Sequence, residues 1–328
     1  MKDSSTTWRV GGAKITRIDE TGFALAPEVL FPEWDAESER ALGACFSAAS
    51  VDLENRRVSL KTHLWVVELD GRTVIVDTGI GNGKARPFSA LFDRLENPVL
   101  ERFEAAGFRR EQVDYVLLTH LHVDHVGWNT HWQDNHWAPV FPNATYVFSQ
   151  REHDYFATPG GEPRRMVFED SVLPIIEAQQ ARVVPDAVEE IVEGIRFLPT
   201  PGHSIGHMAI EIRSQGHTAL FSGDVMHSPL QVYRPQWNST FCLDQPLARA
   251  SRQWLLNHAV KTGAIVFPAH FPEASVGTVQ EGPQGFEWHY LNGAIGRGLR
   301  TYAPLRGVSR TTIVTMATGS LTLTSTDL

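Results

Sequence analysis

Short apolar runs recur along the chain, and most of them end in a turn that contains glycine or proline. Four early runs have the residue types and the alternation of β-strands: 13–20, 62–69, 73–79 and 113–120. Helical periodicity occurs in three segments: 88–107, 169–181 and 246–262. Pro98 is expected to divide the first of these into two helices, because a proline removes a helical hydrogen bond. This alternation of strands with helices predicts a layered α/β architecture.

The segment THLHVDH, at 119–125, places three histidines and one aspartate within six positions at the end of a predicted strand. Three later runs repeat the design of an apolar strand that ends in a turn with a polar residue. They are GIRFLPTPGHS with His203, HTALFSGDV with Asp224, and AIVFPAHF with His270. A single histidine at a strand end is usually only hydrogen-bonded, whereas a set of strand ends with the same chemistry indicates a shared site.

Neutral imidazole and carboxylate are the usual protein ligands of Zn²⁺. Because residues two apart in an extended chain point the same way, His120 and His122 are expected to face one cation. Asp124 and His125, further round the turn, are expected to face a second cation. A carboxylate from another strand can bridge such a pair of cations, and Asp224 is the candidate for that role.

The composition narrows the class of protein and its partners. The chain has 328 residues, 42% of them hydrophobic, with a mean hydropathy of -0.20, which is enough for a substantial core. A net charge of -9 without a stripe of Lys and Arg argues against nucleic acid or a membrane surface as partner. Two cysteines cannot form a disulfide scaffold. Without an apolar leader or a run of ~20 apolar residues, we expect a cytoplasmic location.

The motif THLHVDH, followed by TPGHSIGH, FSGDV and PAH, resembles the metallo-β-lactamase superfamily over residues 63–271. The resemblance implies a four-layer αββα sandwich, which we expect to form one catalytic domain over 1–290, with a C-terminal tail at 291–328. It implies two divalent metal ions, expected to be Zn²⁺, although the same donors accept Mn, Fe and Co. The first ion is assigned to His120, His122 and His203, the second to Asp124, His125 and His270, and Asp224 is shared. Asp77, in VDTG, is expected to orient the metal-binding loops.

Within the superfamily, the chain is similar to the quorum-quenching lactonases and the methyl-parathion-hydrolase-like enzymes. Such lactonases place a tyrosine three residues after the bridging aspartate, and this chain has His227 there. The resemblance predicts hydrolysis of an ester-like bond, a lactone or carboxylic ester, by a metal-bridging hydroxide. Asp124 or Asp224 would carry the proton, with His227 as the other donor. Two alternatives remain open: hydrolysis of a phosphotriester on the same site, and a mononuclear iron dioxygenase of the persulfide type.

The substrate is expected to be a small molecule with an apolar part, because aromatic and apolar residues surround the metal motifs. The candidates for the pocket wall are Trp128, Phe156, Met226 and Phe271. A homodimer is expected from the resemblance.

Overall fold

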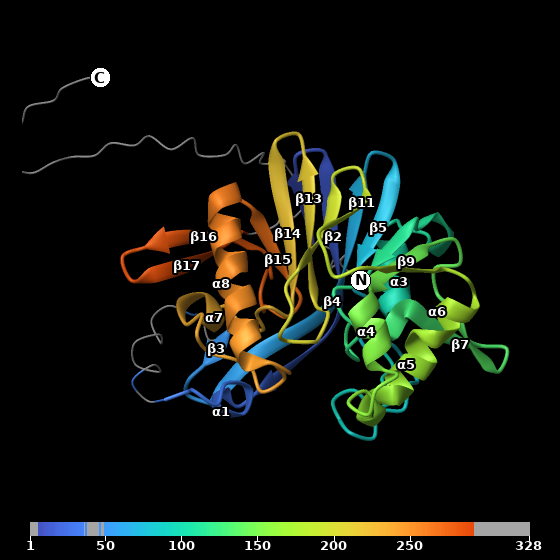
Figure 1. Ribbon diagram of the computed structural model, residues 1–328, viewed down its shortest axis with the longest axis horizontal. Helices are drawn as coiled ribbons and strands as arrows, with labels where there is room; N and C mark the ends of the chain where they lie inside the picture. The colour runs from blue at the N-terminus through green and yellow to red at the C-terminus, as the bar shows by residue number, and fades with distance from the viewer. Residues whose placement is uncertain (1–5, 36, 38–45, 47–48, 292–328) are drawn as a thin grey trace, which may run out of the picture.

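The computed structural model describes residues 6–35, 37, 46 and 49–291, and two large β-sheets lie at its centre (Figure 1). The first sheet has the order β1-β2-β4-β5-β6-β9-β10, with β3 paired to β4. Its strands are β1 Thr6–Val10, β2 Ala13–Leu25, β3 Val51–Asp52, β4 Arg57–Leu69, β5 Arg72–Val76, β6 Tyr115–Leu117, β9 Thr145–Ser149 and β10 Ala181–Val184. β5, β6, β9 and β10 run parallel, so their carboxyl ends meet at one edge.

The second sheet follows the chain, in the order β11 to β17. Its strands are β11 Glu189–Val192, β12 Ile195–Pro199, β13 Met208–Ser214, β14 His217–Gly223, β15 Ile265–Pro268, β16 Gly277–Gly282 and β17 Gly285–Tyr290. Here the parallel pair is β14 and β15. A small hairpin of β7 Thr130–Gln133 and β8 His136–Pro139 stands apart from both sheets.

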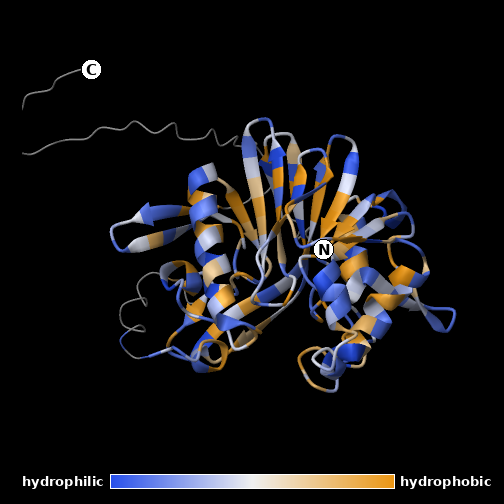
Figure 2. Cartoon of the chain, viewed as in Figure 1, coloured by the Kyte–Doolittle hydropathy of each residue, from blue (hydrophilic) through white to orange (hydrophobic). Residues whose placement is uncertain are grey.

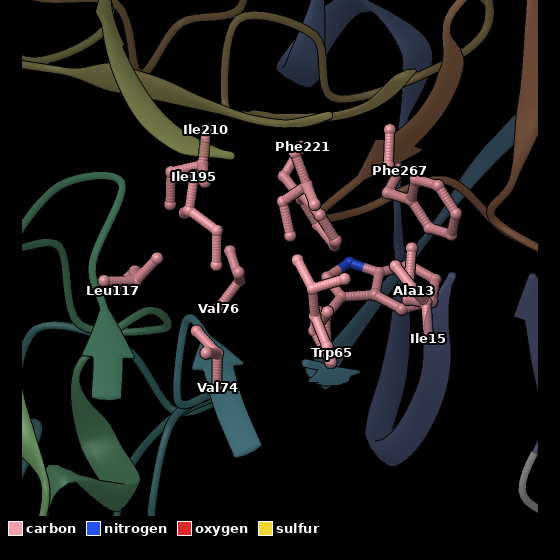
Figure 3. Close-up of a cluster of buried hydrophobic side chains, with 14 of the residues drawn as sticks. Ala13, Ile15, Trp65, Val74, Val76, Leu117, Ile195, Ile210, Phe221 and Phe267 are labelled. Carbon is pink, nitrogen blue, oxygen red and sulfur yellow. The ribbon is translucent and has the colours of Figure 1, made fainter. Parts of the chain in front are cut away.

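The two sheets pack face to face through a core of apolar side chains (Figure 3). Trp65 of the first sheet lies edge-on against Phe267 and Phe221 of the second, with ring centroids 5.2 Å and 6.2 Å apart. Such edge-to-face pairs add stability beyond the burial of apolar area itself.

Helices cover the outer face of each sheet. Those on the first sheet are α3 Val99–Ala105, α4 Gln150–Tyr155, α5 Arg165–Ser171 and α6 Leu173–Glu177. The second sheet is covered by α8 Gln245–Thr262, with the short α7 Leu230–Tyr233 nearby, and α1 Pro27–Leu30 lies against β4. Figure 2 shows both hydrophobic and hydrophilic residues on α5 and α8, as expected for helices with one buried face. The predicted αββα sandwich is therefore confirmed.

The prediction of a helix before Pro98 is wrong, because residues 88–97 form turns and irregular chain. The predicted helix after the proline is present as α3. Side-chain contacts organise this region instead: Asp93 accepts from the backbone N–H of Arg86, and Arg86 pairs with Asp170 at 2.7 Å. The helix expected at 169–181 is also misplaced. The chain forms α5 and α6 around a break at Val172, two residues before Pro174.

The tail predicted from residue 291 lies outside the described residues except for Leu291. None of the helices in the described ranges combines the length with the apolar character that a membrane crossing requires.

Candidate metal centre

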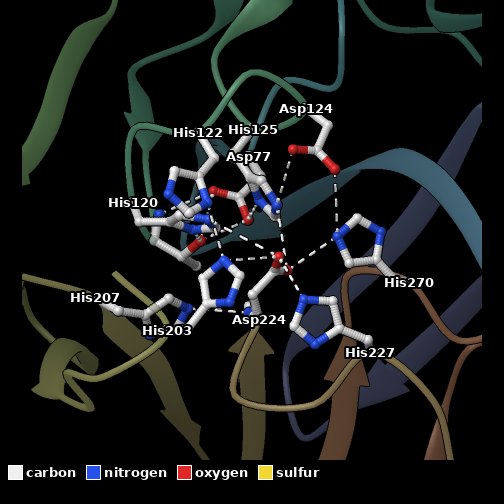
Figure 4. Close-up of polar contacts among 12 residues, drawn as sticks. Asp77, His120, His122, Asp124, His125, His203, His207, Asp224, His227 and His270 are labelled. Carbon is white, nitrogen blue, oxygen red and sulfur yellow. Dashed lines mark hydrogen bonds and ion pairs between the residues drawn. The ribbon is translucent and has the colours of Figure 1, made fainter. Parts of the chain in front are cut away.

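All seven residues that the sequence assigns to metal ions converge at one edge of the sandwich (Figure 4). His120, His122, Asp124 and His125 follow β6, His203 follows β12, Asp224 follows β14 and His270 follows β15. The donors therefore come from both sheets. Each follows a buried strand, so a well-packed core fixes the point at which the polar turn begins.

The side chain of Asp77, directly after β5, organises the THLHVDH turn. Its Oδ1 accepts a hydrogen bond from the backbone N–H of Thr119 at 2.8 Å, and its Oδ2 lies 2.8 Å from Nδ1 of His125. Asp77 has a φ of 54°, an uncommon conformation for a residue other than glycine. With Nδ1 held in this way, Nε2 of His125 faces the centre of the site, which is the orienting role predicted for Asp77.

The carboxylate of Asp224 lies between two sets of imidazoles. Its Oδ1 is 3.0 Å from Nε2 of His270 and 3.2 Å from Nε2 of His125. Its Oδ2 is 3.2 Å from Nε2 of His203 and 3.9 Å from Nε2 of His120. One oxygen therefore faces each set, as a carboxylate that bridges two cations requires.

The donors also fit a metal ion in their spacing. Four groups of three have ligand atoms within 4.8 Å of one another: His120 with His122 and His203; Asp124 with His125 and His270; His120 with His125 and Asp224; and His203 with Asp224 and His227. Ligand atoms around tetrahedral zinc lie roughly 3.3 Å apart for bonds of ~2.0–2.1 Å. The oxygens of Asp224 lie at similar distances, 3.0 to 3.9 Å, from the nearby imidazole nitrogens.

Three buried polar atoms that face the centre of the site have no hydrogen-bond partner among the described residues: Nε2 of His120, Nε2 of His125 and Oδ1 of Asp224. Buried polar atoms are normally satisfied, so this set of orphaned nitrogen and oxygen atoms is the pattern of a site for a divalent cation.

Burial and charge divide the imidazoles into two kinds. Burial lowers the pKa of His120 and His203 well below the ordinary value, and Asp224 opposes it only in part. Burial acts in the same direction on His125 and His270, but Asp224 and other carboxylates outweigh it and raise the pKa of both. In return, His270 and His125 hold the pKa of Asp224 well below its ordinary value in spite of burial. The neutral form of imidazole, which is the form that binds metal, is therefore favoured in His120 and His203.

His227 also faces Asp224, with Nε2 3.3 Å from Oδ2. Its backbone N–H donates to Oε1 of Gln231 at 2.7 Å, and its ring stacks on that of His270 at 5.7 Å. Neither ring nitrogen has a hydrogen-bond partner among the described residues. His227 is therefore placed either to donate a hydrogen bond to a substrate or to join His203 and Asp224 as a ligand.

His207, which the sequence analysis did not assign, positions Asp224. Its Nε2 accepts the backbone N–H of Asp224 at 2.9 Å, while Nδ1 lies 2.9 Å from Oγ1 of Thr200. Gly223 has a φ of 48°, and a Cβ there would lie 2.5 Å from Nε2 of His207, so glycine permits this approach. The only signal in the sequence is the second histidine of TPGHSIGH.

A cavity of about 710 Å³ opens over the metal donors. Asp124, His203, Asp224, His227 and His270 form its polar base. Its walls are largely apolar and include Phe23, Leu25, Phe88, Phe92, Val123, Phe156, Ile205, Phe241 and Leu243. A substrate with a polar reacting group and an apolar part matches this division.

Of the four residues predicted for the pocket wall, Phe156 lines the cavity, and the other three do not. Trp128 is buried in the core beneath the helices of the first sheet, where its Nε1 donates to Glu20 at 2.7 Å. Met226 and Phe271 are buried in the core between the second sheet and α8. These three predictions are wrong because each side chain turns toward a core next to the site.

Comparison with known protein families identifies the superfamily of this chain. The model of the metallo-beta-lactamase superfamily matches residues 60–270, well over half of the chain. The chain therefore belongs to the metallo-beta-lactamase superfamily, and it is a metal-dependent hydrolase.

Two relatives within the superfamily are N-acyl homoserine lactonases that share low sequence identity with this chain. The chain is 23% identical over 236 residues to an N-acyl homoserine lactonase of Bacillus cereus, a match that covers 67% of this chain and 85% of the relative. It is 27% identical over 181 residues to the N-acyl homoserine lactonase AttM of Rhizobium radiobacter, covering 53% of this chain and 64% of that one.

Two solved structures share the fold over 89% of this chain and the whole of their own, each at 22% identity. They are the hydrolase AbOPH of the beta lactamase superfamily, with a TM-score of 0.73, and the dizinc quorum-quenching lactonase AidC, with a TM-score of 0.71.

Proposed function

We propose that this protein opens the ring of a lactone that carries an apolar acyl substituent, with two divalent metal ions, expected to be Zn²⁺. The observation that carries the proposal is the position of Asp224, whose two oxygens face two separate sets of donors at the base of an apolar cavity. The lactonase relatives support the choice of a lactone over other esters.

Two groups of residues would hold the ions. His120, His122 and His203 form the first group, and Asp124, His125 and His270 form the second. Asp224 would be common to both. When bound in such a pair, divalent cations lower the pKa of a water molecule toward ~7 and polarise a carbonyl group.

The residues of this chain then have distinct tasks. The ionised Asp224 is a ligand rather than a proton carrier, because the neighbouring histidines hold its pKa low. Asp124, whose carboxylate lines the cavity, takes the proton of the attacking water and returns it to the ring oxygen as the C–O bond breaks. Burial lowers the pKa of His227, so this imidazole is neutral at pH 7 and donates its one N–H to the carbonyl oxygen as negative charge develops there.

The apolar walls would hold the acyl chain. Phe156 and Phe241, with Leu243, lie on the wall above the polar base. Each buried CH₂ group contributes about 0.8 kcal/mol, so a longer chain is expected to bind more tightly until the cavity is filled.

Turnover of three substrate classes by the purified protein tests this function: N-acyl homoserine lactones with chains of increasing length, aryl carboxylic esters and an aryl phosphotriester. Metal content is measured in the same preparation. We expect two zinc-like ions per chain and the highest kcat/KM for a lactone, with KM falling as the chain lengthens.

The His227→Phe variant tests the role of this imidazole, because loss of its N–H is expected to lower kcat by about 10²-fold with a smaller effect on KM. The proposal is overturned if the phosphotriester is turned over faster than the lactones, or if the protein contains one iron per chain and consumes oxygen.

A further inference from the structure

Glu152 is a buried carboxylate that belongs to none of the groups of metal donors. It lies on α4 with 2% of its surface exposed. Its two oxygens bond to different loops. Oε2 accepts the backbone N–H of Leu121 at 3.0 Å, and Oε1 accepts the backbone N–H of Gly206 at 2.7 Å. Hydrogen bonds to an ionised carboxylate are about twice as strong as neutral ones.

The two loops that Glu152 connects carry the first group of donors. Leu121 lies between His120 and His122, after β6 of the first sheet. Gly206 lies three residues after His203, between β12 and β13 of the second sheet. Glu152 therefore ties a loop of one sheet to a loop of the other at the point where their imidazoles meet.

The start of α4 is itself held in place. Oγ of Ser149 accepts from the backbone N–H of Arg151 at 3.1 Å and donates to Oδ1 of Asp186 at 2.7 Å. The loop at Gly206 passes so close that a Cβ there would lie 2.4 Å from Oγ of Ser149 and 3.0 Å from the backbone nitrogen of Glu152. Only glycine allows the backbone to approach this closely, and the bond to Glu152 depends on that approach.

The second group of donors is oriented by other contacts. Asp77 holds His125 through Nδ1, and the backbone carbonyl of Lys61 lies 2.8 Å from Nδ1 of His270. Neither contact involves α4.

We propose that Glu152 is a positioning residue for the first metal ion alone, an inference that rests on the proposed assignment of two ions to two groups. By holding the loops of His122 and His203 together across the two sheets, it preorganises the first group before an ion enters.

The Glu152→Gln variant tests the proposal, because a glutamine can accept only one of the two backbone N–H groups and presents an NH₂ donor to the other. The measurement is the Zn²⁺ content of the wild-type protein and the variant under increasing concentrations of a chelator, together with the absorption spectrum of the Co²⁺-loaded forms. We expect the affinity for one ion to fall by about 10- to 100-fold and the affinity for the other to change by less than about threefold.

The matched control is Asp154→Asn, which removes an exposed carboxylate two residues along the same helix and leaves both bonds of Glu152 in place. It should bind both ions as the wild type does. Gly206→Ala, which keeps the carboxylate but forces the loop away from it, should reproduce the selective loss and serves if Glu152→Gln does not fold.

Equal loss of both ions, unchanged binding of both, or a wild-type protein with only one ion would overturn the inference. A wild type that binds two ions but opens no lactone would refute the proposed substrate and leave the role of Glu152 standing, so the two failures are distinguishable.

Discussion

The two groups of donors that share Asp224 differ in charge and in support. The first consists of three imidazoles, whereas the second includes the carboxylate of Asp124 and has Asp77 behind His125. Carboxylates raise the pKa of His125 and His270, while burial dominates and lowers the pKa of His120 and His203. Apart from the shared Asp224, the first group therefore has no carboxylate and forms a neutral position, whereas Asp124 makes the second group a negative position next to it. We infer that the additional carboxylate of Asp124 strengthens the attraction of the second position for a divalent cation.

The largest effect is expected from removal of the residue that the two positions share. In Asp224→Ala, both positions lose an oxygen ligand, so both ions should be lost and turnover should fall by more than about 100-fold, the upper range for supporting contacts alone. Metal analysis and steady-state kinetics provide the measurement. Asp224→Asn keeps one ligating oxygen and is expected to retain one ion. If Asp224→Ala retains two ions and near-normal turnover, Asp224 does not bridge.

A smaller and selective effect is expected from variants on the two sides. His203→Ala removes one imidazole from the neutral position, and His270→Ala removes one from the negative position. Each variant should retain one ion per chain, and the ion left in His203→Ala should resist a chelator better because its position keeps Asp124. Chelator titration of the two variants in parallel gives the comparison. Identical curves would mean that the two positions do not differ in affinity.

The smallest effect on the centre is expected from a carboxylate outside it. Glu211 on β13 is fully buried and pairs with Arg196, Arg213 at 2.8 Å and His258 at 2.6 Å, which lower its pKa to about 2 in spite of burial. Because the folded pKa lies below the ordinary value of 4.5, Glu211 stabilises the fold above about pH 4.5, and this contribution is lost as the pH falls toward 2.

The Glu211→Gln variant should therefore be less stable at pH 7 by at most about 3 kcal/mol, with a difference from the wild type that shrinks at pH 3. Denaturant unfolding at both pH values measures this. The variant should still bind two ions at pH 7, which separates loss of stability from loss of metal. A stability difference that grows on acidification would contradict a lowered pKa of Glu211 in the folded protein.

The sequence was most informative where strand ends carry polar residues. His120, His203 and His270 could be assigned together because each follows an apolar strand and interrupts it with a turn. The structure places these residues and the other four donors at one edge. The layered fold was also predictable, since apolar runs and helical periodicity depend on local spacing.

The walls of the cavity were harder to predict. Trp128, Met226 and Phe271 lie next to the metal donors in sequence, but each turns into a core. An apolar side chain near a site suits a core and a cavity wall equally well, and only the tertiary packing decides between them. The helix expected before Pro98 failed for a similar reason, because contacts with Asp170, far along the chain, fix residues near Arg86.

Glu152 and His207 were missed for another reason. Their partners are backbone N–H groups, at Leu121, Gly206 and Asp224, and every residue type except proline offers such a group. No side-chain pattern in the sequence marks such bonds.

The origin of the donors in both sheets has a consequence for the stability of the whole sandwich. An ion held by His122 and His203 joins residues that are 81 positions apart and belong to opposite layers. Ligands that bind only the native form stabilise it in proportion to the logarithm of their concentration over Kd, by about 2.7 kcal/mol at 100 times Kd. We therefore expect metal supply to act on folding as well as on catalysis, so that scarcity of the cation would lower the amount of folded enzyme along with its activity.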